Sequence, residues 1–274
     1  MTDATAIGGQ GRRARRLFNI HGLKRGATRL RVSLAAGVRA DEPVTVAFAT
    51  VVALSLYFAV LPGVDMAVSA LFYSANAGFV LVDNPVLKGL RKSSSWVLGL
   101  ILLGLIGELV LALRRNPRRL DGWGRRAAVL LMGLVIASGF LVNGILKSMW
   151  GRARPIQIET FGGDADFTRA WQVSDNCLSN CSFVSGEGSS AAWMVAVVVL
   201  MVPAPWRRWA LPVAVAYGAA LSINRIAFGG HFLSDILLSW ALTGLVIAAL
   251  HRLALTCPRL ARQARRARRR VAAA

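Results

Sequence analysis

Residues 127–146 read AAVLLMGLVIASGFLVNGIL, a run without a single charged side chain. A helix needs about 20 mostly apolar residues to cross the hydrocarbon core of a bilayer. Arg125 and Arg126 stand directly before this run and Lys147 directly after it. The run therefore predicts a membrane-spanning helix with a charged boundary at each end.

Other parts of the chain repeat this pattern. The six spans that we predict are residues 43–64, 93–113, 127–146, 188–206, 209–224 and 232–251. The chain of 274 residues is 55% hydrophobic and only 17% charged, which is too apolar for an ordinary soluble domain. Glu108 and Asp235 interrupt two of the spans, and such residues usually face the protein interior or serve function. We expect an all-α polytopic membrane protein, a bundle of six transmembrane helices.

The basic residues predict the orientation of this bundle. Lys and Arg outnumber Asp and Glu by 33 to 13, and 25 of the 33 fall on one side when six spans alternate across the bilayer. Basic residues concentrate on the cytoplasmic side, so we expect both termini there and a bacterial inner (cytoplasmic) membrane. The predicted parts are a basic cytoplasmic arm (1–42), a six-span domain (43–255) and an Arg-rich cytoplasmic tail (256–274). No aromatic residues alternate with the arginines, which disfavours nucleic acid as a partner.

Two long connections lie on the predicted outer side. Residues 65–92 are expected to form a loop that is apolar enough for an interfacial helix. Residues 147–187 are richer in Gly, Asn and Asp and predict an exposed loop. Cys177 and Cys181 lie in this second loop, where oxidising conditions permit a disulfide. A bridge between them and a pair of free thiols both remain open.

Polar residues gather at the outer ends of four predicted spans, where a membrane protein has no structural need for them. If the helices bundle, three cations surround one small volume, and a cluster of Arg and Lys is suited to binding phosphate. The N–H groups at the start of the fourth span would face the same anion. The predicted phosphate-binding residues are Lys147, Arg154, Ser185, Gly186 and Arg225.

His231 and Asp235 are four residues apart and so share one face of a helical turn. The carboxylate can then accept from one ring nitrogen and leave the lone pair of the other nitrogen free, as in an activated nucleophile. Attack on phosphorus would form a phosphohistidine that water hydrolyses, with the cations stabilising the charge that develops. This chemistry requires no metal and no cofactor. Taken singly, each basic residue is more simply a snorkelling anchor and the histidine a helix cap; the joint pattern favours a site.

Two segments of the chain resemble the signature blocks of a known family. Residues 147–155 read Lys-x6-Arg-Pro, and residues 225–235 read Arg-x5-His-x3-Asp. They resemble the first and third blocks of the type 2 phosphatidic acid phosphatase (PAP2) superfamily, which includes membrane lipid phosphatases and soluble haloperoxidases. The resemblance implies phosphate binding by Lys147, Arg154 and Arg225, a nucleophile at His231 and an orienting carboxylate at Asp235.

The middle block departs from the family pattern. The family usually has Pro-Ser-Gly-His, and this chain has Val184-Ser185-Gly186-Glu187. The resemblance keeps Ser185 and Gly186 in phosphate-binding positions. Since the family's histidine is thought to protonate the leaving oxygen, Glu187 either takes over as the general acid or marks a changed reaction. The alternative is a structural carboxylate paired with the pocket cations.

These expectations predict a metal-independent phosphatase that acts on a membrane lipid from the outer face. Candidate substrates are lipid A, a polyprenyl pyrophosphate and a glycerophospholipid phosphate, and the envelope context favours lipid A. One alternative is a phosphotransferase that moves phosphate between lipids. Another is a non-catalytic carrier of a phospholipid or anion, which would bind phosphate without cleaving it.

Overall fold

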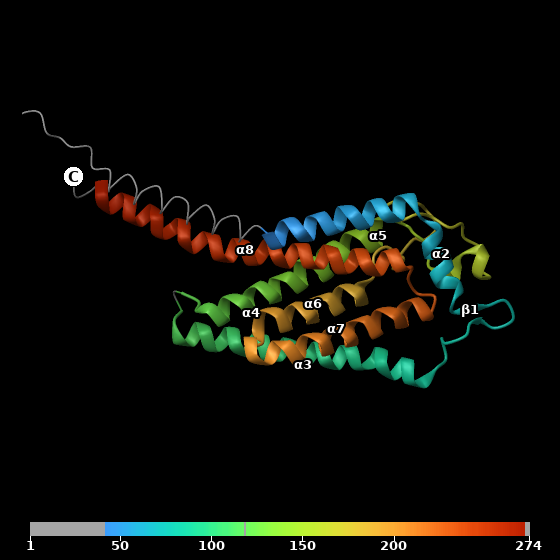
Figure 1. Cartoon of the computed structure of the whole chain (residues 1–274), viewed down its shortest axis with the longest axis horizontal. Coiled ribbons are helices and arrows are strands. Elements are labelled where there is room, and N and C mark those ends of the chain that lie inside the picture. Colours follow the sequence, from blue (N-terminus) through green and yellow to red (C-terminus); the bar gives the residue numbers. More distant parts are fainter. Residues whose placement is uncertain (1–41, 118, 272–274) are drawn as a thin grey trace, which may run out of the picture. The chain divides into compact units, whose positions relative to one another are not determined.

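The structure, a computed structural model, describes residues 42–117 and 119–271, with side chains as far as residue 256 (Figure 1). The predicted basic arm lies outside the described residues except for Glu42. The helices and strands are the helix Glu42–Val60, α2 (Gly63–Ala70), β1 (Tyr73–Ser74), β2 (Gly78–Phe79), α3 (Pro85–Arg115), α4 (Gly122–Gly133), a π-helical segment (Leu134–Leu146), α5 (Lys147–Met149), the 3₁₀ turns Pro155–Gln157 and Glu159–Phe161, α6 (Gly186–Met201), α7 (Ala204–Ala227) and α8 (Leu233–Val271).

Five helices of the described chain are long and apolar enough to cross a membrane. They are Glu42–Val60, Pro85–Arg115, Gly122–Met149, Ala204–Ala227 and Leu233–Thr256. The fourth predicted span, 188–206, corresponds to the shorter α6, which has 16 residues and ends before Pro203. Proline does not continue a helix, so the residues after it form α7 instead of extending the predicted span to residue 206. The all-α, multi-pass architecture is confirmed. In place of six full-length spans, the described chain has five such helices and one shorter apolar helix.

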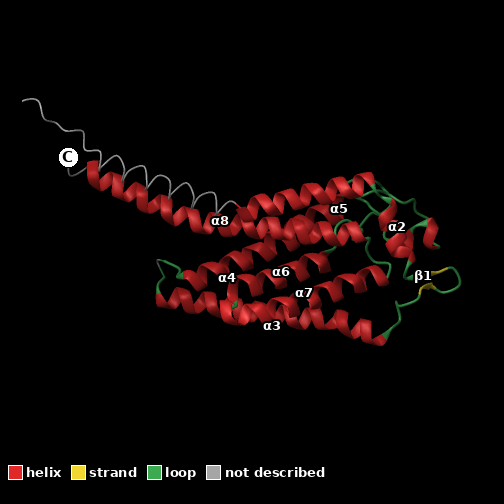
Figure 2. Cartoon of the chain, in the orientation of Figure 1, coloured by secondary structure: helices red, strands yellow, loops and turns green. Residues whose placement is uncertain are grey.

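The predicted outer loop, residues 65–92, is more ordered than expected. Most of α2 and a two-stranded antiparallel hairpin occupy its first half, with Tyr73 opposite Phe79 (Figure 2). Residues 85–92 belong to α3, so the prediction of a loop there was wrong. The Asn84 side chain accepts from the N–H groups of Val86 and Leu87, and Pro85 occupies the first helical turn; both features start a helix.

Helix α6 is the central element of the bundle and packs against α4, α7, α8 and the π-helical segment. Trp193 on α6 is fully buried, and its Nε1 donates to the Leu130 carbonyl oxygen at 2.7 Å. Ser189 joins Ser138 and Thr243 through hydroxyl contacts of 2.7 Å each, which satisfies polar groups that have no access to water. These contacts hold the beginning of α6 in place at one end of the bundle.

The structure bears on one predicted domain boundary and on the charged residue inside the second span. Helix α8 continues from Leu233 to Val271, so no helix end marks the predicted domain boundary after residue 255, and that division stays a prediction. Glu108, which interrupts the second span, accepts a hydrogen bond of 2.7 Å from Nη2 of Arg115, seven residues further along the same helix. The Glu108 carboxylate is therefore paired, which is the structural alternative to a direct role.

Candidate active site

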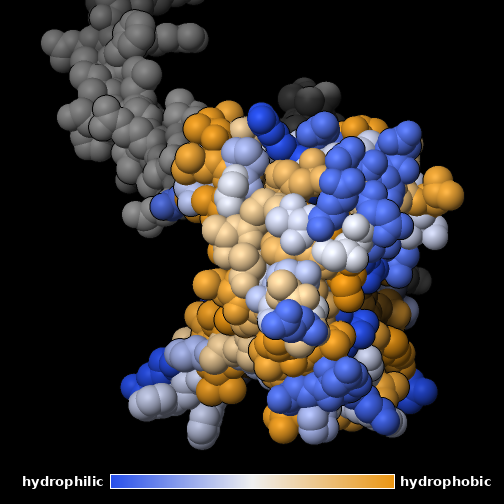
Figure 3. All heavy atoms as spheres, turned by 90° about the vertical axis from the view of Figure 1, so that its right-hand side faces the viewer, coloured by the Kyte–Doolittle hydropathy of each residue, from blue (hydrophilic) through white to orange (hydrophobic). Residues whose placement is uncertain are grey.

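Three backbone hydrogen bonds join the three sequence segments that carry the predicted site. They run from Ser182 N to Arg152 O at 2.8 Å, from Ser185 N to Asp235 O at 3.2 Å, and from Ile156 N to Gly229 O at 3.0 Å. The segments meet at the end of the bundle that carries α2 and the hairpin (Figure 1). Hydrophilic residues cover much of this end (Figure 3). The convergence that the sequence predicts is therefore present.

His231 lies just before α8 and is 1% exposed. Its Nδ1 is 2.8 Å from the Ser182 carbonyl oxygen and 3.7 Å from Asp235 Oδ2. A carbonyl oxygen only accepts, so Nδ1 carries the proton and Nε2 has the free lone pair. Burial lowers the pKa of His231 to about 4, although the neighbouring Asp235 opposes this shift. The imidazole is neutral near pH 7, and the Ser182 carbonyl shares with Asp235 the orienting role that we assigned to the carboxylate alone.

Asp235 is fully buried and accepts hydrogen bonds at both oxygens. Oδ2 accepts from Ser182 Oγ at 2.6 Å and from Phe232 N at 2.9 Å, and Oδ1 accepts from Arg152 Nη1 at 2.7 Å. The bond to Phe232 N closes the first turn of α8 from its third position, as in a capping box. One side chain thus starts α8 and stands beside the ring of His231.

A buried ion network behind Asp235 was not anticipated from the sequence. Arg152 has no exposed surface, and its guanidinium bridges Asp235 to Asp65 Oδ2, which is 2.9 Å from Nη2. Ser234 Oγ donates to the same Asp65 oxygen at 2.6 Å. Burial raises the pKa of Asp65, and the Arg152 charge opposes that rise. The available signal was the lone carboxylate of Asp65 in the apolar segment 63–70, since such a group usually has a buried partner.

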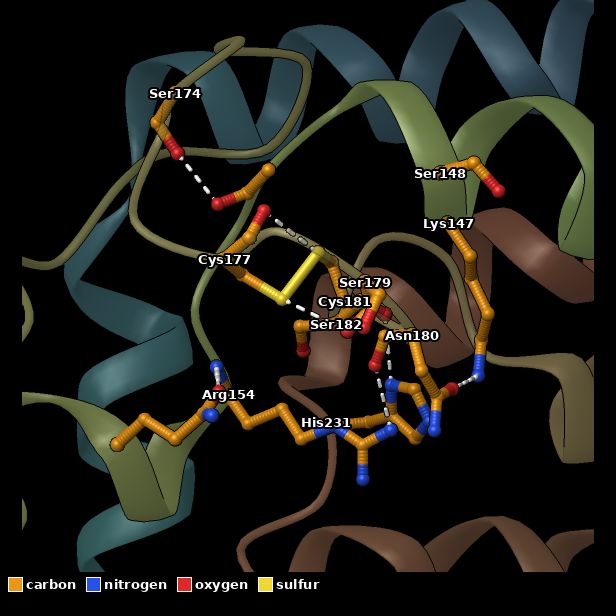
Figure 4. The surroundings of a disulfide bond; sticks show 12 residues. Lys147, Ser148, Arg154, Ser174, Cys177, Ser179, Asn180, Cys181, Ser182 and His231 are labelled. Carbon is orange, nitrogen blue, oxygen red and sulfur yellow. Dashed lines mark hydrogen bonds between the residues drawn. A yellow bond between two sulfur atoms is a disulfide. The ribbon is translucent and has the colours of Figure 1, made fainter.

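Lys147 and Arg154 converge on one residue of the predicted outer loop, Asn180 (Figure 4). Lys147 Nζ donates to Asn180 Oδ1 at 3.2 Å, and Arg154 Nη2 donates to the Asn180 carbonyl oxygen at 2.8 Å. Cys177 and Cys181 form a disulfide that encloses Asn180. Of the two states that the sequence leaves open, the structure contains the disulfide, and its loop positions two predicted phosphate-binding cations.

Glu187 bridges two guanidinium groups at the start of α6. Its Oε1 accepts from Arg91 Nε at 3.0 Å, and its Oε2 lies 3.4 Å from Arg225 Nε. Arg225 is 5% exposed, and its Nε has no hydrogen-bond acceptor within the described part of the chain. The arrangement corresponds to the structural alternative for Glu187, and the general-acid role stays a prediction. Arg91, from α3, is a further cation that sequence reasoning missed.

Glycines let the backbone approach polar side chains of the site closely. A Cβ atom at Gly230 would lie 2.5 Å from Arg225 Nη2, and one at Gly186 would lie 2.9 Å from Asn143 Oδ1. Ser185 caps α6 by accepting from the Gly188 N–H at 3.1 Å. The other first-turn N–H groups of α6 have no acceptor within the helix and suit an anion.

The geometry combines a neutral buried imidazole, one free ring nitrogen and cations from several segments. This combination suits nucleophilic attack on a phosphate group, because the free lone pair can attack phosphorus while the cations stabilise the developing charge on the oxygens. Within residues 42–117 and 119–256, whose side chains the structure describes, no three His, Cys, Asp or Glu side chains are grouped to hold a metal ion.

Comparison with known proteins agrees with this chemistry. The PAP2 superfamily profile matches residues 128–259. A lipid A 4'-phosphatase of Rhizobium etli is 34% identical over 217 residues, covering 74% of this chain and 83% of the relative. A lipid A 4'-phosphatase of Francisella tularensis subsp. novicida is 28% identical, covering 66% of this chain and 82% of the relative.

A solved structure shares the fold. The crystal structure of a transmembrane PAP2 type phosphatidylglycerolphosphate phosphatase from Bacillus subtilis superposes with a TM-score of 0.51 and 19% identity, covering 79% of this chain and 97% of that chain. With the sequence relatives, the fold and the site geometry pointing the same way, the chain belongs to the PAP2 superfamily and is a membrane lipid phosphatase.

Proposed function

We propose that this protein is a lipid A 4'-phosphatase that acts on the periplasmic face of the bacterial inner membrane. The observation that carries the catalytic part of this proposal is His231, whose Nδ1 is bound to the Ser182 carbonyl while Nε2 remains free. The choice of lipid A is supported by the names of the relatives from Rhizobium and Francisella. The six-helix arrangement with both termini cytoplasmic is supported by the distribution of Lys and Arg.

In the proposed reaction, the Nε2 lone pair of His231 attacks phosphorus, and the bond from phosphorus to the sugar oxygen breaks. The departing oxygen takes up a proton from solvent water, and the phosphoryl group remains on Nε2. Water then attacks phosphorus, the N–P bond breaks, inorganic phosphate leaves and the lone pair returns to Nε2. Lys147, Arg154 and Arg225 stabilise the charge on the phosphoryl oxygens in both steps. The proposed steps involve no metal ion.

Ser185, Gly186 and Asp235 have supporting roles in this proposal. The N–H groups at the start of α6 complete the phosphate site, and Ser185 holds their orientation by capping the helix. Asp235 stabilises the positive charge that His231 acquires when it forms a bond to phosphorus. Glu187 holds Arg225 and Arg91 in position. The competing assignment is that Glu187 acts as the general acid, as predicted from the sequence.

The test uses the purified full chain in a neutral detergent with lipid A that carries phosphates at the 1 and 4' positions. We expect release of inorganic phosphate, and mass spectrometry should locate the loss at the 4' position. His231→Ala should retain its fold and release no phosphate. Loss of the 1-phosphate instead, or faster turnover of a polyprenyl pyrophosphate or a phosphatidylglycerophosphate, would contradict the substrate assignment.

The two alternatives give different results in the same assay. A phosphotransferase would place the phosphate on a second lipid, which mass spectrometry detects as a new phosphorylated species. A carrier would bind the lipid equally well in the wild type and in His231→Ala and release phosphate in neither.

A further inference from the structure

Next to the phosphate site, the outer end of α3 presents a second cationic face. Lys88, Arg91, Lys92 and Ser95 follow the spacing that puts helical residues on one side. They help to line a cavity of about 580 Å³, which we call the α3 pocket. Glu187 also lines this pocket, so one carboxylate stands between the pocket and Arg225.

The ion pairs of the α3 pocket leave it with positive charge. Lys88 Nζ lies 2.8 Å from Asp83 Oδ1, and Arg91 pairs with Glu187 at 3.0 Å. Lys92 has no ion-pair partner within the described part of the chain. The pocket therefore offers an ammonium group that no carboxylate neutralises, beside the hydroxyl-bearing Ser94 and Ser95.

The pocket and the phosphate site are electrostatically coupled. Glu187 lies 3.0 Å from Arg91 Nη2 and 3.4 Å from Arg225 Nε, so the pocket and the phosphate site share one carboxylate. Burial lowers the pKa of Arg154, and the Arg91 charge lowers it further. Two groups of cations with one shared carboxylate repel each other unless anions are bound. One bound phosphate can neutralise the charges of Lys147, Arg154 and Arg225. Arg91 and Lys92 line the α3 pocket instead, so a second anion is needed there.

We infer that the α3 pocket binds a second anionic group of the same lipid substrate, of the phosphate class. This inference rests on the proposed function and adds a second anionic group to the features that the enzyme recognises in its substrate. Lipid A carries a phosphate on each of its two sugars, so one phosphate can face His231 while the other lies against α3. The pocket then selects lipids with two separated anionic groups over lipids with one.

The test compares two substrates in neutral detergent micelles: lipid A with phosphates at positions 1 and 4', and lipid A with only the 4'-phosphate. For Lys92→Gln, we expect KM for the first substrate to rise about 5- to 10-fold with kcat unchanged, because a charge-assisted contact to the bound anion is lost. KM for the second substrate should not change. Wild-type KM should be lower for the first substrate than for the second.

Lys88→Gln and Arg169→Gln serve as companion variants. Lys88→Gln should raise KM in the same selective manner but less, since Lys88 already pairs with Asp83. Arg169 is an exposed cation of the outer loop outside the α3 pocket, and its replacement should change neither KM. Thermal unfolding of each variant in detergent checks that the fold is kept.

Three results would overturn the inference. The first is an equal rise in KM for both substrates in Lys92→Gln, which would mean that the lysine acts on the phosphate site. The second is a selective effect that appears only when phosphatidylglycerol is added to the micelles, which would assign the pocket to bulk anionic headgroups. The third, no phosphate release by the wild type from either lipid, overturns the proposed function and the second-phosphate site with it.

Discussion

His231 shows how one backbone contact sets the chemistry of a side chain. The Ser182 carbonyl fixes the proton on Nδ1, and burial keeps the ring neutral by lowering its pKa to about 4. The free lone pair is therefore available over a wide pH range. The four-residue spacing to Asp235 predicted the neighbouring carboxylate but not the carbonyl, which comes from a different segment.

The pKa of His231 leads to a pH-dependent prediction. A protonated imidazole has no lone pair to donate, so kcat/KM should fall as the pH drops through about 4, and not near 6.5 as for an ordinary histidine. The measurement is the pH profile of phosphate release from a water-soluble aryl phosphate. His231→Gln should lower the rate by about 10⁴-fold or more at every pH, since removal of a nucleophile has effects of this size. A midpoint near 6.5, or a variant within tenfold of the wild type, would remove His231 from its assigned role.

Glu187→Gln separates the two assignments of this residue. Both carboxylate oxygens already face guanidinium groups, so we expect the variant to loosen Arg225 and to slow a lipid substrate and an aryl phosphate equally, by about 10-fold. A general acid would matter much more for the lipid, because a sugar oxygen needs a proton to leave and an aryl oxygen needs little help. Steady-state rates measured with both substrates distinguish the two assignments. A fall in rate confined to the lipid substrate would support the general-acid assignment.

The disulfide between Cys177 and Cys181 closes the loop 177–181, and we predict that activity depends on this bridge. It holds Asn180 against Lys147 and Arg154, while a bridge over so few residues adds little to global stability. We expect the double variant Cys177→Ser, Cys181→Ser to lose about 10-fold in kcat/KM with only a small change in Tm. Cys257→Ser is the matched control and should behave as the wild type. Unchanged activity in the double variant would show that the loop keeps its conformation without the bridge.

Helix α2 is joined to α8 by the ion network of Asp65, Arg152 and Asp235. Asp65→Asn leaves the buried Arg152 with one carboxylate in place of two, and breaking a buried ion pair costs about 3–5 kcal/mol. We expect a clear fall in Tm and a lower kcat, because Arg152 also positions Asp235 beside His231. Asp164→Asn, at an exposed position, is the control. If Tm and kcat both stay at wild-type values in Asp65→Asn, the network does not support the site.

For the molecule as a whole, the basic residues predict which end faces the cytoplasm. We expect single cysteines at Asn76 and Asp166, placed in a chain whose own cysteines are replaced by serine, to react with a membrane-impermeant maleimide from the periplasmic side. A cysteine at Asn116 should react only after the inner membrane is permeabilised, since it lies within the Arg-rich segment 114–126. Gel-shift labelling measures this, and the reverse pattern would place the active site in the cytoplasm.

Local patterns were sufficient for the membrane class and most helices, and they pointed to the residues that the structure brings together at the proposed site. The length of an apolar run indicates whether a helix can cross a bilayer, and the four-residue spacing of His231 and Asp235 predicts that they share one helix face. Both are properties of neighbouring residues, so they can be read without a fold. The short α6 and the early start of α3 were missed because Pro203 and Asn84 act through helix termination and capping, which an average over an apolar window does not detect.

Tertiary packing determines which of the charged side chains meet. Arg152 lies 87 residues from Asp65 and 83 from Asp235, and Arg91 lies 96 residues from Glu187. No periodicity connects residues so far apart, although each buried charge required some partner. The partner is selected by how α2, α3, α6 and α8 pack. This packing places the Arg152 guanidinium behind Asp235, next to the proposed nucleophile, and the Arg91 guanidinium beside the proposed phosphate site.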